Sequence, residues 1–383
     1  MRIGFVSDSI TRDLTGVGRY ALNIFNQFTS MGFPPTPIDW RERAELQEIT
    51  GKTLPAIITI QNPWRRYKNL FWHASLLQKL DKEKTLPDII FTPSQFVHPI
   101  GQIRKPLVYV VHDLSFMTYP ECHRRGKKEL FQLFFKRTLK KAAHIVCVSH
   151  YTKGQLMRYY PSSSNKTSVI SEGVDPRFKP VENHGTLGRV REKYRLPEAF
   201  LLYVGTIEPR KNIDQLIKAY HIMGERIPLP LYISGKPGWL TDALMVEHHR
   251  LKLRDRVRFM GYVPDEDLPA LYSLSTAFVY ISKEEGFGLP PLEAMSCGTP
   301  AIVSRAGALP EVLADAVLYA DHASPISIGE KLEAICHDVS LQKEYREKGL
   351  ARASSYTWEK TANSLLMLFQ KIVSSKQRNM GTP

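Results

Sequence analysis

Short runs of β-branched and aromatic residues alternate with longer amphipathic stretches along the first half of the chain. Six such runs predict strands: RIGFVS (2–7), AIITI (56–60), DIIF (88–91), LVYVV (107–111), HIVCVS (144–149) and TSVIS (167–171). Strands of a parallel sheet are buried on both faces and read as nearly continuous apolar runs separated by helices. The pattern therefore predicts an α/β domain built on a parallel sheet.

The same pattern begins again after a polar, turn-rich stretch at 175–197. Five further strands are predicted: FLLYVG (200–205), LPLYIS (229–234), RVRFM (256–260), TAFVYI (276–281) and AIVS (301–304). We expect two Rossmann-like domains, at 1–175 and 198–357, followed by a helix at about 358–373. Because ligands of parallel sheets bind beyond the carboxyl ends of the strands, we expect the motifs below to line a cleft at the domain junction.

Composition is that of an ordinary globular protein, with 383 residues and 43% hydrophobic residues. The first ten residues, MRIGFVSDSI, resemble neither a signal peptide nor the start of a membrane span. Cys122, Cys147, Cys297 and Cys336 are scattered without a C-x-x-C pair. They are expected to be reduced thiols of a cytoplasmic protein.

The excess positive charge of the chain is confined to its first half. Residues 1–200 contain 31 Lys+Arg and 17 Asp+Glu, whereas residues 201–383 contain 21 of each. Cations mix with aromatic residues at PWRRYKNLFWH (63–73) and HRRGKKELFQLFFKRTLKK (123–141). Such segments suit an anionic membrane surface, an anionic acceptor or nucleic acid, and a solvated helix face is the alternative.

The segment EEGFGLPPLEAMSCGTP (284–300) is the most specific chemical signal. Two prolines suit the first turn of a helix, and Gly298 suits its end. The preceding loop, Gly286-Phe287-Gly288-Leu289, would offer backbone N–H groups at a helix N-terminus to phosphate or sugar hydroxyls. Glu285 and Glu293 flank this loop, and either acid alone could be an ordinary capping residue.

Three other motifs follow predicted strands. Gly16 and Gly18 read as G-x-G-x-x-A, but SITRDLT separates them from the strand, so a loop opening a helix is favoured over a dinucleotide site. His112-Asp113 ends the strand LVYVV, where functional residues of α/β proteins collect, although a lone His is often structural. Arg210-Lys211 precede a helix capped by Asn212 and could grip a diphosphate or be surface charges.

Taken together, these motifs resemble those of the retaining family-4 glycosyltransferases over nearly the whole chain. The matching segments are Glu285-x7-Glu293 within EEGFGLPPLEAMSCGTPAIVS, TGVGRY, the VHD strand end, VISEGVDPRFKP, VGTIEPRKN, FMGYVPDEDLPALY and YTWEKTA. The resemblance implies the two-domain GT-B fold, with an acceptor-binding first domain and a donor-binding second one. It also implies that the last helix crosses back to the first domain.

The resemblance also implies roles for individual residues. Lys211 would bind the donor diphosphate, Glu293 the ribose hydroxyls and Glu285 the transferred sugar, while His112 would meet that sugar near its reacting carbon. The other implied donor-binding residues are Arg210, Thr206, Gly261, Tyr262, Val263, Gly286, Phe287, Gly288 and Leu289. The implied acceptor-side residues are Gly16, Gly18 and Asp113. Thr206 stands where many family members have Arg, and Arg210 could compensate.

The implied activity is metal-independent transfer of a sugar from a GDP- or UDP-sugar to an acceptor hydroxyl, with the anomeric configuration retained and no cofactor. VGTIEPRKN slightly favours mannose. The acceptor would be a glycan or a lipid-linked glycan of cell-surface polysaccharide or glycolipid synthesis, at the cytoplasmic face of the membrane. A GT-B sugar-nucleotide epimerase is one alternative. A nucleic-acid-binding protein is another, but it leaves the two glutamates unexplained, and no nucleic acid is expected.

Overall fold

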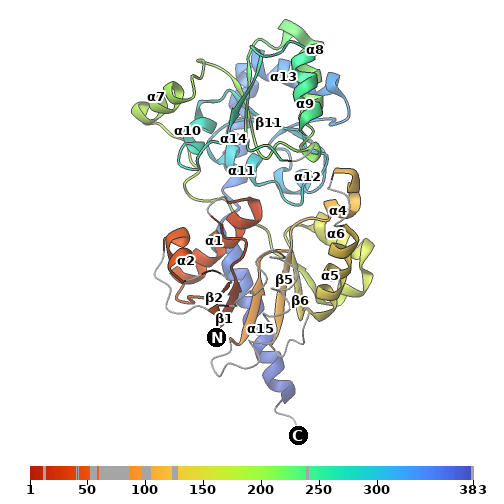
Figure 1. Cartoon of the computed structure of the whole chain (residues 1–383). Helices are drawn as coiled ribbons and strands as arrows, with labels where there is room; N and C mark the ends of the chain where they lie inside the picture. Colours follow the sequence, from red (N-terminus) through yellow and green to blue (C-terminus); the bar gives the residue numbers. More distant parts are fainter. Residues whose placement is uncertain are drawn as a thin grey trace. The chain divides into compact units, whose positions relative to one another are not determined.

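The computed structural model describes residues 1–11, 14–39, 41, 43–51, 58–59, 87–95, 105–122, 128–238 and 241–380. The chain is divided into two compact units (Figure 1). The first comprises Met1–Leu114, Arg125–Gly173 and Trp358–Pro383, and the second comprises Ser115–Arg124 and Val174–Thr357. The segment Ser115–Arg124 thus groups with the second unit, although the sequence pattern placed it in the first domain.

The first unit contains a seven-stranded sheet in which all paired strands are parallel, in the order β3-β2-β1-β4-β5-β6-β7. Its strands are β1 (Ile3–Val6), β2 (Thr36–Asp39), β3 (Ile58–Thr59), β4 (Ile89–Thr92), β5 (Leu107–Val111), β6 (His144–Cys147) and β7 (Thr167–Val169). β1, β4 and β5 lie in the middle and are buried along their whole length. This explains why their sequences are almost purely apolar.

The second unit contains a six-stranded parallel sheet in the order β10-β9-β8-β11-β12-β13. Its strands are β8 (Leu201–Val204), β9 (Leu231–Ser234), β10 (Val257–Gly261), β11 (Ala277–Tyr280), β12 (Ala301–Ser304) and β13 (Leu318–Ala320). In both sheets the strand order reverses beside the first strand of the unit. Such a reversal opens a crevice at the carboxyl ends of the strands, where doubly wound α/β proteins bind ligands.

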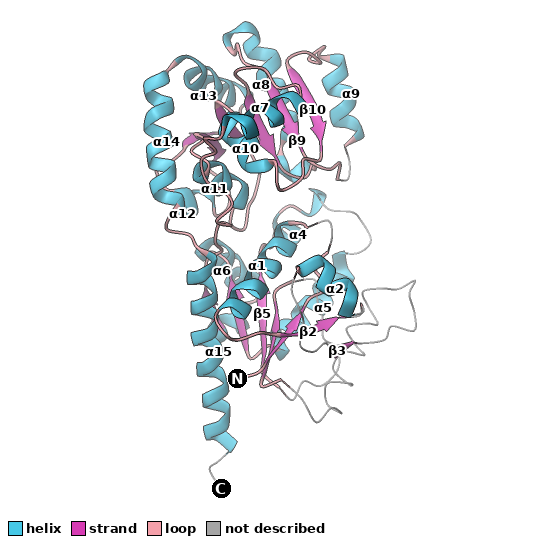
Figure 2. Cartoon of the chain, turned by 90° about the vertical axis from the view of Figure 1, so that its left-hand side faces the viewer, coloured by secondary structure: helices cyan, strands magenta, loops and turns pink. Residues whose placement is uncertain are grey.

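Helices flank both sheets (Figure 2). The α-helices of the first unit are α1 (Gly16–Ser30), α2 (Arg43–Thr50), α5 (Lys128–Lys141), α6 (His150–Tyr159) and α15 (Trp358–Met380). Those of the second unit are α4 (Ser115–Thr118), α7 (His184–Lys193), α8 (Ile213–Met223), α9 (Asp242–Arg250), α10 (Leu268–Leu274), α11 (Leu289–Ser296), α12 (Leu309–Leu313), α13 (Pro325–His337) and α14 (Val339–Ala353). The 3₁₀-helices are η2 (Pro120–Cys122), η3 (Pro161–Lys166), η4 (Pro209–Lys211) and η5 (Gly224–Arg226).

The sequence pattern did not predict two of the strands. β2 contains Pro37, which lacks a backbone N–H group and ordinarily argues against an inner strand. β13 has three residues and pairs only with β12, which makes it an edge strand too short for a periodic signal. The eleven predicted strands are all present within the described residues, with shifts of a few residues at their ends.

The last helix, α15, follows the second unit in sequence but packs on the first. It extends to Met380, seven residues beyond the predicted end at 373. The ring of Phe369 lies 5.8 Å from that of Phe28 on α1 and 5.2 Å from that of Phe91 on β4, measured between centroids. Near its start, the ring of Trp358 lies 5.5 Å from that of Tyr20 on α1. Aromatic packing therefore makes α15 part of the first unit's core.

A buried carboxylate in the second unit ties α7 to the start of α10. The side chain of Asp267 is fully buried and accepts hydrogen bonds of 2.7 Å each from Arg189, Lys193 and Tyr194. Burial raises the pKa of Asp267, but these three donors outweigh burial and lower it to about 2. Because the folded-state pKa is depressed, this stabilisation is present above the unfolded-state pKa and is lost as the pH falls toward 2.

We predict that Asp267→Asn lowers the stability of the second unit at pH 7 by about 1 to 2 kcal/mol, a value discounted for the exposed cations. Hydrogen–deuterium exchange of α7 and α10 peptides under increasing urea measures this. The gap from the wild type should shrink between pH 4 and pH 2. Asp265→Asn, which removes a carboxylate 3.9 Å from Arg177, is the matched control with little effect. A gap that does not depend on pH would contradict the assignment.

Candidate functional site

The loop that leads into α11 has the backbone geometry that its glycines predict. Gly288 adopts a φ of +107° at the N-cap of α11, and a Cβ atom there would lie 2.5 Å from Cδ2 of Leu309. Pro290 occupies the first turn of α11, and Gly298, with a φ of +77°, follows its end. Only glycine fits the position of Gly288 without strain. The start and the end of the predicted helix are thus confirmed.

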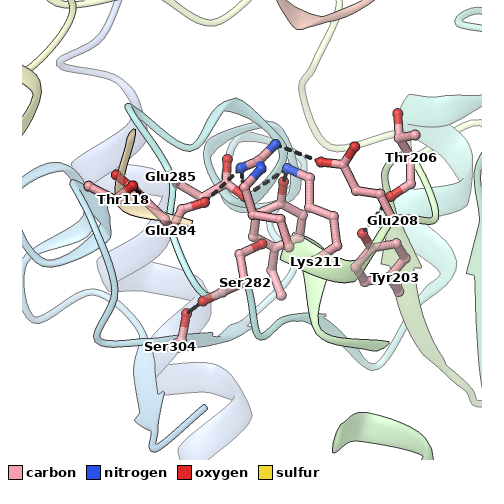
Figure 3. Close-up of polar contacts among 11 residues, drawn as sticks. Thr118, Tyr203, Thr206, Glu208, Lys211, Ser282, Glu284, Glu285 and Ser304 are labelled. Atoms are coloured by element: carbon pink, nitrogen blue, oxygen red, sulfur yellow. Dashed lines mark hydrogen bonds and ion pairs between the residues drawn. The ribbon is translucent and has the colours of Figure 1, made fainter. Parts of the chain in front are cut away.

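Glu285, just before this loop, forms the centre of a buried charge cluster (Figure 3). Nζ of Lys211 donates to Oε1 of Glu285 at 2.7 Å, and Nη1 of Arg210 lies 3.3 Å from the same oxygen. Lys211 also donates to the hydroxyl of Tyr280, on β11. We call these residues, together with the two that hold Arg210, the Glu285 cluster: Glu208, Arg210, Lys211, Tyr280, Glu284 and Glu285.

Arg210 is held on two further sides. It donates from Nη1 to the backbone oxygen of Glu284 at 2.7 Å and from Nη2 to Oε1 of Glu208 at 2.8 Å. The carboxylate of Glu284 in turn accepts a hydrogen bond from Oγ1 of Thr118, at the end of α4. Both cations of the cluster are therefore fixed in position, as a site that binds a charged group requires.

The cluster sets the charge states of its members. Burial raises the pKa of Glu285, but the neighbouring charges of Lys211 and Arg210 outweigh burial and lower it to about 2. Burial, followed by the charge of Arg210, lowers the pKa of Lys211 below its ordinary value, while Glu285 opposes that change. At neutral pH, Glu285 is an ionised carboxylate, and its negative charge interacts with the positive charges of both Lys211 and Arg210. An incoming anion would compete with this carboxylate for the same cations.

Asn212 shapes the turn that presents Arg210 and Lys211. It lies between η4 and α8 in the left-handed conformation, with φ 60° and ψ 31°, and is 1% exposed. The sequence predicted a helix capped by Asn212, and Asn212 occupies the N-cap position of α8. Its side chain makes no capping hydrogen bond and instead donates from Nδ2 to the backbone oxygen of His322 at 2.7 Å.

The other predicted donor-side residues have varied surroundings. The hydroxyl of Tyr272 donates to Oε2 of Glu293 at 3.1 Å, within a buried environment. Thr206 is exposed after β8, and its backbone oxygen accepts a 3.4 Å hydrogen bond from Tyr203. Phe287 is buried, with its ring 5.6 Å from that of Tyr356. Phe287 therefore anchors the loop by packing, and a contact with a ligand would involve its backbone.

The end of β10 carries the three residues assigned to a base pocket. Gly261 has a φ of +76° and permits the turn, and Val263 is buried. Tyr262 is 46% exposed, and Nζ of Lys236 lies 4.5 Å from its ring centroid. Of these three residues, only Tyr262 has a large side chain that is exposed to solvent. An exposed aromatic ring beside a cation is suited to stacking.

In the first unit, His112 follows β5 and is buried. Its Nδ1 lies 3.0 Å from Oε1 of Glu172, and its Nε2 lies 2.7 Å from the backbone oxygen of Pro93. Burial lowers the pKa of His112, but its hydrogen bond and charge interaction with Glu172 outweigh burial and raise it above the ordinary value. Sequence reasoning missed Glu172, although it belongs to the segment VISEGVDPRFKP that the family resemblance had singled out.

The two glycines that were predicted to lie on the acceptor side differ in their surroundings. A Cβ atom on Gly18 would lie 2.6 Å from the backbone oxygen of Ser9, whereas one on Gly16 would meet nothing within 4 Å. The N–H group of Gly18 donates to the capping side chain of Thr15 at 3.4 Å. Gly18 is therefore required for the close packing of α1, and its amide serves the helix cap. The backbone N–H of Asp113 donates to Oε1 of Gln95 at 3.2 Å.

The structure therefore forms two polar groups from the predicted residues. Lys211, Arg210 and Glu285 come together in the second unit, near the α11 loop. His112 and Asp113 lie together in the first unit, to which Gly16 and Gly18 also belong.

One basic segment can be examined, because the other, 63–73, lies outside the described residues, as do residues 123–127. On α5 the aromatic residues Phe134 and Phe135 are buried. The exposed face of α5 carries the cations Lys136, Arg137, Lys140 and Lys141. Phe134 and Phe135 thus belong to the core, as a solvated amphipathic helix requires, and the cations face solvent. Leu133, 46% exposed, is the large apolar side chain on that face.

Metal-independent transfer was expected partly because no D-x-D motif was seen in the sequence, but Asp265, Glu266 and Asp267 form such a motif. Asp267 is occupied by its three donors, as described above. Within the described residues, no group of three or more His, Cys, Asp or Glu side chains is arranged to hold a metal ion. In the same part of the chain, no helix is long and apolar enough to cross a membrane.

Comparison with known proteins identifies the family. Residues 14–178 match the model "Glycosyltransferase Family 4", and residues 189–352 match "Glycosyl transferases group 1". The chain is 33% identical to O-antigen chain mannosyltransferase B of Escherichia coli, over 94% of this chain and 97% of that protein. The chain belongs to the family-4 glycosyltransferases. Its resemblance to this family, predicted from the motifs, is confirmed, and the enzyme is a glycosyltransferase.

Other relatives support this assignment. The chain is 29% identical to the serotype-specific mannosyltransferase WbdA of Escherichia coli over 76% of its own length, and the match spans 38% of that longer protein. Among solved structures, sucrose-phosphate synthase from Thermosynechococcus elongatus aligns with a TM-score of 0.78, at 20% identity and over 98% of this chain and 100% of that one. Anabaena HepE in complex with UDP and glucose aligns with a TM-score of 0.77, at 18% identity and over 97% and 100%. The predicted GT-B fold is confirmed.

We predict that Asn212→Ala destabilises the second unit of the glycosyltransferase more than Asn212→Gly does. Both variants lose the hydrogen bond to His322. Alanine is also strained in the left-handed conformation, so the Asn212→Ala protein should be about 0.5 to 1 kcal/mol less stable than the Asn212→Gly protein. Urea unfolding followed by hydrogen exchange of α8 amides measures the difference. Equal stability of the two variants would show that the backbone relaxes at this turn.

Proposed function

We propose that this enzyme is a retaining mannosyltransferase that transfers mannose from GDP-mannose to a hydroxyl of a growing cell-surface glycan. The name of the Escherichia coli relative, O-antigen chain mannosyltransferase B, supports both the sugar and the kind of acceptor, because the likeness extends over nearly the whole of both proteins. The segment VGTIEPRKN, which includes Arg210 and Lys211, also favours this donor. The proposed reaction uses no cofactor beyond the donor.

The buried pairing of Lys211 with Glu285 is the observation that carries this proposal. Bond cleavage at the anomeric carbon leaves its electron pair on a phosphate oxygen, so negative charge develops on the diphosphate. Lys211 and Arg210 are fixed and largely withdrawn from water, and such preorganised cations stabilise developing charge strongly. When the diphosphate engages these cations, the carboxylate of Glu285 can accept hydrogen bonds from the sugar hydroxyls.

The remaining residues supply the other proposed donor contacts. Glu293, oriented by Tyr272, would accept hydrogen bonds from the ribose hydroxyls. Amides at the start of α11 would face the sugar or its phosphate, because a helix N-terminus favours anions. The exposed ring of Tyr262 would stack on the base. His112 would act near the reacting carbon, with Asp113 on the acceptor side.

We propose a transfer step that retains the anomeric configuration, as the resemblance to the family implies. The acceptor hydroxyl attacks the face of the sugar from which the diphosphate departs. Its oxygen forms the new bond to the anomeric carbon, and its proton passes to the departing phosphate oxygen. Positive charge on Lys211 and Arg210 serves the leaving group in place of a metal ion.

We further propose that the enzyme works at the cytoplasmic face of an anionic membrane, where a lipid-linked acceptor would be presented. The exposed cations of α5 support this. Each Lys or Arg near such a surface contributes about 1 kcal/mol.

We predict that Lys211→Ala lowers kcat by roughly a hundredfold to a thousandfold, because the leaving diphosphate loses a preorganised cation. Release of GDP from GDP-mannose, followed together with the mannosylated product, measures this. Lys218→Ala is the matched control, since Lys218 is a partly exposed cation on α8 that pairs with Asp214 at 3.6 Å. Near-native turnover of Lys211→Ala would refute the role of Lys211. A wild type that uses UDP-sugars in preference to GDP-mannose would refute the donor.

The membrane proposal predicts salt-sensitive binding to vesicles of phosphatidylglycerol and phosphatidylethanolamine, and none to phosphatidylcholine alone. Glutamine at all four exposed α5 cations should weaken the partition coefficient by at least about tenfold in a sedimentation assay. The control variant carries glutamine at four exposed cations of the second unit: Arg226, Arg250, Arg254 and Lys343. Equal binding by the two variants would refute a role for α5.

A further inference from the structure

His112 is fixed at four points, more than packing alone requires. Its backbone N–H donates to Oε1 of Gln95 at 2.8 Å, and its backbone oxygen accepts from Oγ1 of Thr152 at 3.2 Å. Its two ring nitrogens face Glu172 and the backbone oxygen of Pro93. These partners come from the segment after β4, from α6 and from the segment after β7. A side chain whose position is fixed by this many hydrogen bonds is characteristic of a functional residue held in one geometry.

The partners of the ring decide its charge. A neutral imidazole has one N–H group, so one nitrogen must direct a lone pair at its neighbour. The oxygen of Pro93 can only accept, and so can an ionised Glu172. Both contacts, at 2.7 and 3.0 Å, are satisfied together only when each ring nitrogen carries a proton. The geometry therefore favours the imidazolium, with Glu172 as its counter-ion.

The surroundings strengthen this pairing. The ring of Tyr20 lies edge-on to His112 at 4.9 Å, and Trp358 packs behind Tyr20. His112 is 8% exposed and Glu172 5% exposed, so little water screens their attraction. Of the other described titratable groups at this ring, Asp113 adds negative charge, and burial raises the pKa of Tyr20 so far that it stays neutral. Each of these groups favours a protonated His112 or leaves its charge unchanged.

A stabilising role is a poor explanation for a buried pair of this kind. Burial of two charges costs several kcal/mol, and an apolar pair of similar size is often equally stable or more so. Glu172 also reaches His112 from the segment after β7, a strand that lies two strands away from β5 in the sheet order. The pair lies at the carboxyl end of a parallel sheet, where ligands of such folds bind. A perturbed, paired titratable group in this place points to function.

We propose that Glu172 is a positioning residue that keeps His112 protonated, so that His112 presents a fixed positive charge to the substrates and does not remove the acceptor proton. This inference rests on the proposed function, because it assigns a charge state to a residue of the transfer site. A cation at this edge would favour negative charge on the departing diphosphate. A general base would need the neutral imidazole.

The two roles predict opposite pH dependence. Because the folded-state pKa of His112 is raised, its positive charge is present at low pH and is lost as the pH rises through that pKa. If the charge is needed, kcat falls on the alkaline side of this pKa. If the neutral form is needed, kcat falls on the acid side.

Glu172→Gln separates these roles while preserving the contacts. A glutamine side chain can donate to Nδ1 of a neutral His112 whose Nε2–H still donates to Pro93. We expect kcat of this variant to be lower than wild type by roughly tenfold or more at pH 7.5 and to recover as the pH is lowered toward 6. If His112 is a base, the variant should instead keep its kcat at pH 7.5 and extend its activity to lower pH. That result would overturn the proposal.

Glu359→Gln is the matched control, because Glu359 is an exposed acid in the first turn of α15. The same exchange of carboxylate for amide should leave the pH profile of kcat unchanged there. A shift as large as that of Glu172→Gln would show a general effect of charge on the first unit and overturn the specific role of Glu172.

A direct measurement keeps the inference testable even if Glu172→Gln does not fold. In histidine labelled with ¹⁵N, the His112 signals are identified by their absence in His112→Gln, and their titration gives its pKa. A wild-type pKa at or below the ordinary value of about 6.5 would overturn the proposal. A pKa above it, lowered by Glu172→Gln and unchanged by Glu359→Gln, supports it. The titration needs no substrate, so a wild type that transfers no mannose counts against the proposed function alone.

Discussion

The structure of the second unit depends on one constraint: a buried cation, Lys211, must lie beside a carboxylate, that of Glu285. Lys211 and Glu285 are each less than a tenth exposed, and either charge alone would be costly to withdraw from water. Their meeting requires the left-handed turn at Asn212 and the glycine-dependent loop before α11. Segments that in sequence look like separate motifs are therefore parts of one electrostatic arrangement.

The first unit also contains a buried pair of ionisable side chains, formed by different residues. His112 and Glu172 are 60 residues apart in sequence, and Lys211 and Glu285 are 74 apart. In each unit a cation that follows one strand meets a carboxylate that follows another strand of the same sheet. Parallel topology makes such meetings possible, because it places the carboxyl ends of all strands along one edge. The charge pairs thus follow from sheet order more than from local sequence.

The contrast between local sequence signals and pairings set by sheet order explains which features could be predicted from the sequence. The inner strands and the start of α11 were predictable because their signals, apolar runs and proline or glycine at fixed offsets, are local. The candidate residues Lys211, Glu285 and His112 were found because they follow such local signals. Glu172 as the partner of His112, and the bond between Asn212 and His322, could not be found in this way. Those pairings depend on which strands are neighbours, and no local pattern encodes that order.

The position of α15 has a consequence for synthesis of the chain. The second unit is complete once Thr357 has left the ribosome, whereas the first still lacks its final helix. Until then, Phe28 and Phe91 lack the ring of Phe369 that packs against them. Because domains fold largely as units and in order of synthesis, the part of the chain that is made first becomes complete last. A nascent chain stalled before α15 would therefore contain a complete second unit and an incomplete first one.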